Sequence, residues 1–288
     1  MLIICTLTRR KAALTIDAPL TPRNHPMPEF TMYQVDAFTS ALFRGNPAAV
    51  LVLDDWLPEA TMQNIAAENN LAETAFVRPN GRGWDLRWFT PVHEAPFCGH
   101  ATLATSHVLA HEMGIDGQLV FETQVGTLRV DRSNDGYQLD FPSFPPEILS
   151  EIPAPLRAIF GTGEVKAFRN FENMFVELAD ERAVVEFVPD LPAILKLDPL
   201  SLVITAKGDE HDFVSRYFAP LAGIPEDPVT GSIHATLVPY WVQKLGKTNL
   251  SAFQRSSRGG HLLCELKGDR VLLSGSAVTF MKAQIYLP

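Results

Sequence analysis

The sequence has few cysteines, no long apolar run and no extended basic block. Its three cysteines, Cys5, Cys98 and Cys264, are odd in number and far apart, which argues against a disulfide framework and favours a cytoplasmic protein. No apolar run approaches the ~18 residues that a membrane-spanning helix needs. The basic run at residues 9–11 is short and the formal net charge is −9, so nucleic acids and anionic membranes are poor default partners.

The rest of the composition is that of an ordinary globular protein. With 288 residues, 46% of them hydrophobic, the chain is long enough for one large or two modest domains. Residues 1–31 lack periodicity, and we interpret them as an N-terminal extension outside the fold. We place a first lobe at 32–150 and a second at 151–288, divided within the proline-rich stretch 142–165, and we allow the last strand to pack back on the first lobe.

Four landmarks recur in the same order in the two halves of the chain, and this order indicates an internal duplication. The matched pairs are RWFTP (87–91) with RYFAP (216–220), the x-Gly-x steps 98–100 and 230–232, Gly114 with Gly246, and the probable strands 119–123 and 250–253. Gly114 and Gly246 each lie fifteen residues after the glycine of the x-Gly-x step in their half. A second register, which matches 100–103 to 234–237, stays open, although it aligns only one end of the segment.

Each half contains one apolar segment that predicts a buried helix. Apolar residues between Gly99 and Gly114 cover too much of the circumference for a surface helix, so we expect this helix to lie inside a wrapped antiparallel sheet. The second helix contains Pro239, which should kink it or shift its start. The predicted fold is α+β, with two pseudo-symmetric lobes, each a barrel-like, mostly antiparallel sheet wrapped around a central helix.

Gly99 and Gly231 each stand where a loop gives way to a helix. Glycine there allows a ligand to approach the backbone, and the free N–H groups of a helix N-terminus attract anions. Two such termini facing each other would hold a carboxylate between the lobes. The alternative is that both glycines only permit tight turns.

Cys98 would lie at one of these helix starts, where the pKa of a thiol falls. The matching position in the second half is Thr230, so racemisation by two opposed thiols is unsupported, and Cys98 is equally compatible with a small packed residue. His93, Cys98 and His100 have the side chains of metal ligands, but their spacing fits no structural zinc pattern. We therefore predict no metal.

Two acidic residues are candidates for proton transfer. Glu73 leads into the apolar strand 74–77, where partial burial would raise its pKa into a useful range. A solvated loop carboxylate is the alternative that the pattern alone favours. Asp227 precedes the turn at 230–232 and would equally serve to cap the following helix.

Taken together, these residues resemble the phenazine-biosynthesis PhzF-like isomerase family, relatives of diaminopimelate epimerase. The segments that carry the resemblance, in order along the chain, are 36–38 (DAF), 45–50 (GNPAAV), 70–76 (NLAETAF), 87–91 (RWFTP), 96–104 (PFCGHATLA) and 226–232 (EDPVTGS). The resemblance implies a diaminopimelate-epimerase-like fold, a homodimer, and cofactor-free isomerisation of a small carboxylate, similar to that of trans-2,3-dihydro-3-hydroxyanthranilate.

The family's catalytic residues correspond by resemblance to Glu73, His100, Asp227 and Ser232. We expect the substrate also to meet five further positions, which are Gly99, Gly231, Thr230, Cys98 and Asn46. The phenazine enzyme lacks a cysteine at the position of Cys98, so the substrate is left open. Two alternatives remain, namely a member of the family that binds a small acid or a protein without catalysis, and a one-thiol epimerase that uses Cys98.

Overall fold

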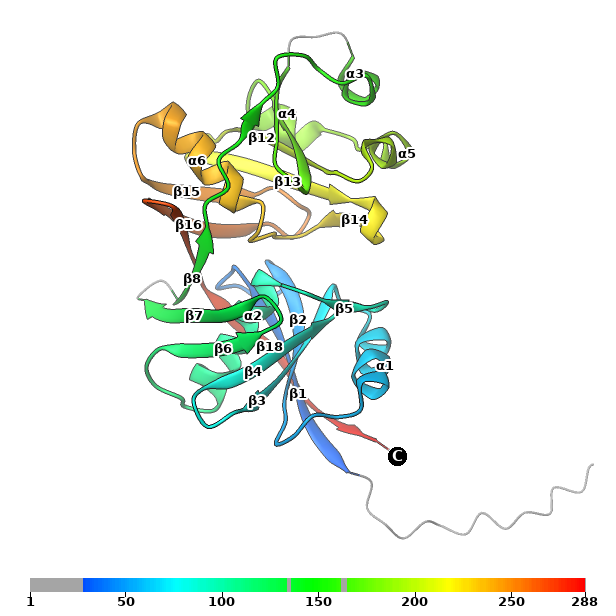
Figure 1. The fold of residues 1–288 in the computed structure, drawn as a ribbon, viewed down its shortest axis with the longest axis vertical. Helices are drawn as coiled ribbons and strands as arrows, with labels where there is room; N and C mark the ends of the chain where they lie inside the picture. Colours follow the sequence, from blue (N-terminus) through cyan, green and yellow to red (C-terminus); the bar gives the residue numbers. More distant parts are fainter. Residues whose placement is uncertain (1–27, 134–135, 162–164, 288) are drawn as a thin grey trace, which may run out of the picture.

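Two lobes of similar design follow each other along the chain and lie end to end (Figure 1). The structure is a computed structural model that describes residues 28–133, 136–161 and 165–287. The elements of the first half are β1 Glu29–Ala37, β2 Asn46–Val52, α1 Glu59–Asn69, β3 Glu73–Pro79, β4 Trp84–Phe89, β5 Glu94–Ala95, α2 Gly99–His107, the π-helical segment η1 Val108–Glu112, β6 Leu119–Thr123, β7 Gly126–Ser133 and β8 Gly136–Pro142.

The second half repeats this order, with extra short helices. Its elements are β9 Glu147–Ile148, α3 Ala154–Phe160, β10 Lys166–Arg169, β11 Asn173–Glu177, α4 Glu181–Glu186, α5 Leu191–Ile194, the 3₁₀ segments η2 Leu195–Leu197 and η3 Pro220–Ala222, β12 Ser201–Lys207, β13 Phe213–Ala219, β14 Ile224–Asp227, α6 His234–Leu245, β15 Asn249–Gln254, β16 Gly260–Lys267, β17 Arg270–Gly275 and β18 Ala277–Tyr286.

The strand pairings confirm two pseudo-symmetric lobes. In the first lobe, β2 runs parallel to β3 and β4 parallel to β6, and in the second lobe β11 runs parallel to β12 and β13 parallel to β15. The other pairings are antiparallel, as in β3 with β4 and β12 with β13. The same alternation in both halves is what a duplicated α+β unit produces.

Strands cross between the lobes at their common boundary. The last strand, β18, returns to the first lobe and pairs with β1 from Glu29↔Tyr286 to Ala37↔Ala277. Its counterpart β9 pairs with β10 in the second lobe, at two residues. β8 and β17 pair with each other and join the two sheets (Figure 1). Residues 29–31, interpreted above as part of the extension, begin β1, and residues 1–27 lie outside the described part of the chain.

The central helices are buried, as their apolar composition predicted. Every residue of α2 is buried. Three hydroxyl side chains within this helix donate to carbonyls four residues earlier, so burial leaves none of them unsatisfied. These bonds run from Thr102 to Cys98, from Thr105 to Ala101 and from Ser106 to Thr102, at 2.6–2.8 Å.

Pro239 lies inside α6, which begins at His234, three residues after Gly231, whereas α2 begins at the matching Gly99 itself. The start of the second helix is therefore shifted, as expected. Because proline has no N–H, the carbonyl of Ala235 loses its helical partner. That carbonyl accepts the backbone N–H of Phe144 at 2.9 Å instead, so the link between the lobes is bonded to the helix at the position that proline frees.

The repeated Arg-x-Phe motif has the same role in both lobes. Arg87 of β4 makes a bidentate pair with Glu94 of β5, with both N–O distances at 2.7 Å. Arg216 of β13 makes the same pair with Glu226 of β14, at 2.7 and 2.9 Å. Each arginine therefore holds a short strand against its neighbour, and the second of these strands ends at Asp227.

No helix in the described ranges is long and apolar enough to cross a membrane.

Candidate active site

The starts of the two central helices meet at the boundary between the lobes. Gly99 begins α2, and Gly231 begins the turn that leads into α6, where the N–H of His234 donates to the Gly231 carbonyl at 3.0 Å. A Cβ on Gly99 would lie 3.8 Å from the Gly231 Cα and 3.3 Å from the Phe141 ring. The backbones of the two helix starts therefore lie close to each other, beside the Phe141 ring.

Glu73 lies at the first position of β3, opposite Ala48 of the parallel strand β2. The chain enters this strand through Asn70, whose left-handed conformation (φ 50°) ends α1. The Glu73 side chain is only 13% exposed, and its Oε2 lies 3.3 Å from His100 Nε2. The interpretation of Glu73 as a solvated loop residue is therefore wrong.

His100 is in the first turn of α2, and its two ring nitrogens face different residues. Nδ1 lies 3.3 Å from Asn46 Nδ2, and Nε2 lies 3.3 Å from Glu73 Oε2. Burial lowers the pKa of His100 to about 3, so the imidazole is neutral at pH 7.

Asp227 connects the second lobe to this group. Its Oδ1 accepts from Asn46 Nδ2 at 2.8 Å, and its Oδ2 accepts from the hydroxyl of Thr230. The same Asn46 amide donates to the carbonyl of Val229 at 2.9 Å. Asn46 thus joins His100 of the first lobe to Asp227 and Thr230 of the second, across the lobe boundary.

Gln254 of β15, which no sequence pattern singled out, supports the turn that carries Asp227 and Thr230. Its Nε2 donates to the Asp227 carbonyl at 2.8 Å and to the Thr230 hydroxyl at 3.2 Å, and its Oε1 accepts the Thr230 N–H at 2.9 Å. Gln254 is fully buried. A buried amide with three such bonds holds the turn in one conformation.

The two carboxyl groups both have pKa values raised toward neutral pH. Burial, together with the charge of Asp227, raises the pKa of Glu73 from 4.5 to about 8, and the Cys98 thiol opposes this by hydrogen bonding to the carboxyl. Burial also raises the pKa of Asp227, to about 6, against the bonds from Thr230 and Asn46. A carboxyl with a pKa near the working pH can both take up and release a proton.

The raised pKa of Glu73 predicts a pH-dependent gain in stability for Glu73→Gln. Unfolded chains ionise this carboxyl near pH 4.5 but the folded protein retains its proton to about pH 8, so this group destabilises the fold as pH rises between those values. In urea unfolding, the variant should match the wild type at pH 4.5 and exceed it at pH 8.5, by at most about 1.4 kcal/mol for each pH unit that separates the folded and unfolded pKa values. Glu68→Gln, at an exposed position of α1, is the control. If Glu73→Gln and wild type are equally stable at both pH values, the pKa of Glu73 is not raised by folding.

Cys98 is buried directly before α2, with its sulfur 3.4 Å from His100 Nδ1. Its place at a helix start predicted a lowered pKa for the thiol, and this prediction is wrong. Burial instead raises the pKa of Cys98, and the charge of Glu73 raises it further. Burial and the nearby carboxyl group destabilise the thiolate more than the helix N-terminus stabilises it, so the thiol is protonated at neutral pH.

Ser232 lines a cavity between the lobes that is separate from this network. Its volume is about 510 Å³, and it is also lined by aromatic side chains from both lobes and by four charged residues, Arg129, Asp140, Glu172 and Arg270. Among the aromatic residues, Phe141 lies against both Gly99 and Gly231. Glu73, His100 and Asp227 do not line this cavity.

Tyr217 of β13 is a further neighbour of the site that was not predicted as a functional residue. Burial raises its pKa, and the charges of Asp227, Glu172 and Glu73 add to this effect. Tyr217 also pairs with Asp227 across the β13–β14 pair. The sequence feature that could have pointed to Tyr217 is its place in the repeated motif RYFAP, where the first half has Trp88.

Two groups of side chains bring potential cation ligands together. Glu73, Cys98 and His100 have donor atoms within 4.8 Å of one another, as do His107, His111 and Glu112 at the end of α2. In the first group His100 Nδ1 already faces Asn46 and Cys98. In the second group, His107 and Glu112 are both bonded to Thr279.

Comparisons with known proteins show the family of this chain. The family model described as phenazine biosynthesis-like protein matches residues 35–283. An uncharacterized isomerase of Pseudomonas aeruginosa is 45% identical over 261 residues, which cover 90% of this chain and 99% of the relative.

Solved structures show the same fold. A phenazine biosynthesis protein of the PhzF family from Enterococcus faecalis has a TM-score of 0.87 at 47% identity, over 90% of this chain and all of the other. A predicted epimerase from Pseudomonas aeruginosa has a TM-score of 0.65 at 20% identity, over 90% of this chain and all of the other, and shows similarity of fold alone.

Proposed function

Because this chain belongs to the phenazine biosynthesis-like protein family, we propose that it is a cofactor-independent isomerase that moves a proton on a small unsaturated or amino carboxylic acid. The reaction would be similar to the isomerisation of trans-2,3-dihydro-3-hydroxyanthranilate. The relative from Pseudomonas aeruginosa carries the name isomerase, which supports the reaction class but not a substrate.

One observation carries the proposal. Within the described part of the chain, Asn46 Oδ1, Glu73 Oε2 and His100 Nε2 are buried and have no hydrogen-bond partner, although the last two lie 3.3 Å apart. Buried polar atoms in folded proteins are nearly always paired. Three unpaired atoms in one network, next to two converging helix starts, are suited to bind the polar groups of a substrate.

Glu73 would perform the proton transfer. Its ionised form takes a proton from a carbon that is activated by conjugation, and the electron pair of that C–H bond moves into the conjugated system. The protonated carboxyl then returns the proton to a different carbon, which restores the charge of Glu73. Substrate and product are isomers, so no oxidant, reductant or leaving group is involved.

The other residues would orient the substrate and stabilise the charge that develops on it. Neutral His100 presents its Nε2 to Glu73 at 3.3 Å, where it can bind a polar group of the substrate. The N–H groups at Gly99 and Gly231, with the Ser232 hydroxyl, would bind the carboxylate of the substrate. Asp227 and Asn46 would hold the His100 ring in position.

The test is exchange with solvent hydrogen. Candidate acids, beginning with trans-2,3-dihydro-3-hydroxyanthranilate, are incubated with the protein in D₂O, and products are followed by NMR. We expect an isomer that carries deuterium at the carbon that receives the proton. The proposal would fail if an acid raises the melting temperature of the wild type and of Glu73→Ala equally and is never chemically changed. The protein would then be a non-catalytic binder.

A further inference from the structure

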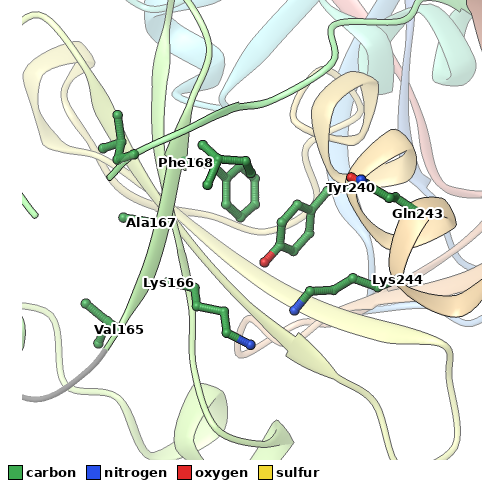
Figure 2. A pocket seen from close by; sticks show the side chains of 9 residues that line it. Val165, Lys166, Ala167, Phe168, Tyr240, Gln243 and Lys244 are labelled. Carbon is green, nitrogen blue, oxygen red and sulfur yellow. The ribbon is translucent and has the colours of Figure 1, made fainter. Parts of the chain in front are cut away.

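A second cavity lies in the second lobe, between α6 and the strands β9 and β10. Its volume is about 480 Å³, and Figure 2 shows Tyr240 and Lys244 from α6 and Lys166 from β10 projecting into the same space. It shares no lining residue with the cavity that Ser232 lines. It is therefore a separate site on the opposite end of α6 from the catalytic network.

The duplication explains why there is space at this position. In the first lobe, the long strand β18 covers the edge of β1, and its Thr279 donates to Glu112 at 2.7 Å at the end of the central helix. The register that superposes Gly99 on Gly231 also superposes Glu112 on Lys244. The strand equivalent to β18 is β9, which pairs with β10 at only two residues, so Lys244 has no covering strand.

The charges in this cavity favour an anion. Glu177 accepts from the Tyr240 hydroxyl and forms a salt bridge with Lys244. Lys166 faces Glu177 across the β10–β11 pair and forms no salt bridge with any described residue. Two ammonium groups around one carboxylate leave a net positive charge, in a protein whose overall charge is −9.

The base of the cavity is apolar. The buried rings of Phe168 and Tyr240 stack on each other there, with centroids 4.0 Å apart and 20° between their planes. Ile148, Leu149 and Val165 supply apolar surface at the rim, and Ile148 is 61% exposed. Apolar and aromatic walls with a few convergent polar groups are typical of small-molecule sites.

We propose that this cavity is a second binding site, which takes a small organic carboxylate with an apolar body. The carboxylate would lie between Lys166 and Lys244, and the apolar body would rest against Ile148, Leu149 and Val165. This site does not depend on the isomerase activity proposed above. Its location on α6, whose other end begins beside Thr230 and Ser232, makes it a candidate for an effector site.

The probe is 4-fluorobenzoate, titrated against the full-length protein and followed by ¹⁹F NMR. We expect a saturable shift for the wild type, at least fivefold weaker binding to Lys166→Met, and loss of binding to the double variant Lys166→Met/Lys244→Met. Lys282→Met, which removes a lysine from β18, is the matched control and should bind as the wild type does. Thermal melts check that the variants are folded, and Lys166 is exposed, so its replacement should leave the fold intact.

Three outcomes would overturn the proposal. They are the absence of a saturable shift with the wild type, unchanged affinity of the lysine variants, and loss of binding in Ser232→Ala, which would place the probe in the other cavity. Failure of this experiment would leave the proton-transfer proposal untouched, because neither lysine belongs to that network.

Discussion

Glu73→Gln is expected to lower the rate of isomerisation roughly 10³-fold, within the range that general acid–base groups supply. The amide keeps the size of the side chain but cannot accept a proton from carbon or return one. Since Glu73 is buried and has an unpaired oxygen beside His100, no solvent carboxylate can replace it. The readout is kcat together with deuterium incorporation in D₂O, which should fall by the same factor.

Two companion variants separate chemistry from structure. Glu68→Gln changes an exposed carboxyl on the helix that precedes β3 and should keep full activity. Glu73→Asp keeps the carboxyl but withdraws it by one methylene, so partial activity is expected. If Glu73→Gln isomerises the substrate at the wild-type rate, Glu73 has no part in proton transfer.

Asp227→Asn is expected to lower kcat/KM by about 10²-fold and to move the pH–rate profile to lower pH. The charge of Asp227 raises the pKa of Glu73, so its removal allows Glu73 to ionise at lower pH. The amide also places an N–H where the wild-type oxygen accepts from Asn46 or Thr230, which disturbs the orientation of His100.

The direction of the pH change is what distinguishes this prediction from a general loss of structure. A variant that is merely misfolded would lose activity without moving the apparent pKa of kcat/KM. Asp209→Asn, at an exposed position of the same lobe, is the control. A profile that keeps the wild-type midpoint would show that Asp227 does not tune Glu73.

Local pattern was enough to predict the repeated units of the fold. Apolar alternation and the turn glycines located β3, β4 and β6, and the spacing of Gly99 to Gly114 predicted a buried helix. The matched motifs RWFTP and RYFAP predicted the duplication. In the structure, Arg87 and Arg216 of these motifs make the same bond to the short strand that follows. These features depend on residues close together in the chain, where periodicity and spacing are informative.

The site was harder to predict because its bonds connect distant segments. Asn46 and Asp227 are 181 residues apart, and Gln254 supports Asp227 from a strand of no distinctive sequence. Pattern alone favoured a solvated Glu73, and the resemblance to a family was needed to select it. The pKa of Cys98 was predicted in the wrong direction, because a helix start is visible in sequence but a buried carboxyl neighbour is not.

The central claim is that Glu73 exchanges a proton with the carbon skeleton of a carboxylic acid held between the two helix starts. The most direct measurement is a crystal structure of Glu73→Gln with an unreacted substrate. The account predicts the exchanging carbon at about 3–3.5 Å from the side-chain amide at position 73, with the substrate carboxylate on the N–H groups at Gly99 and Gly231. A substrate bound with that carbon far from position 73, or with its carboxylate away from both glycines, would contradict it.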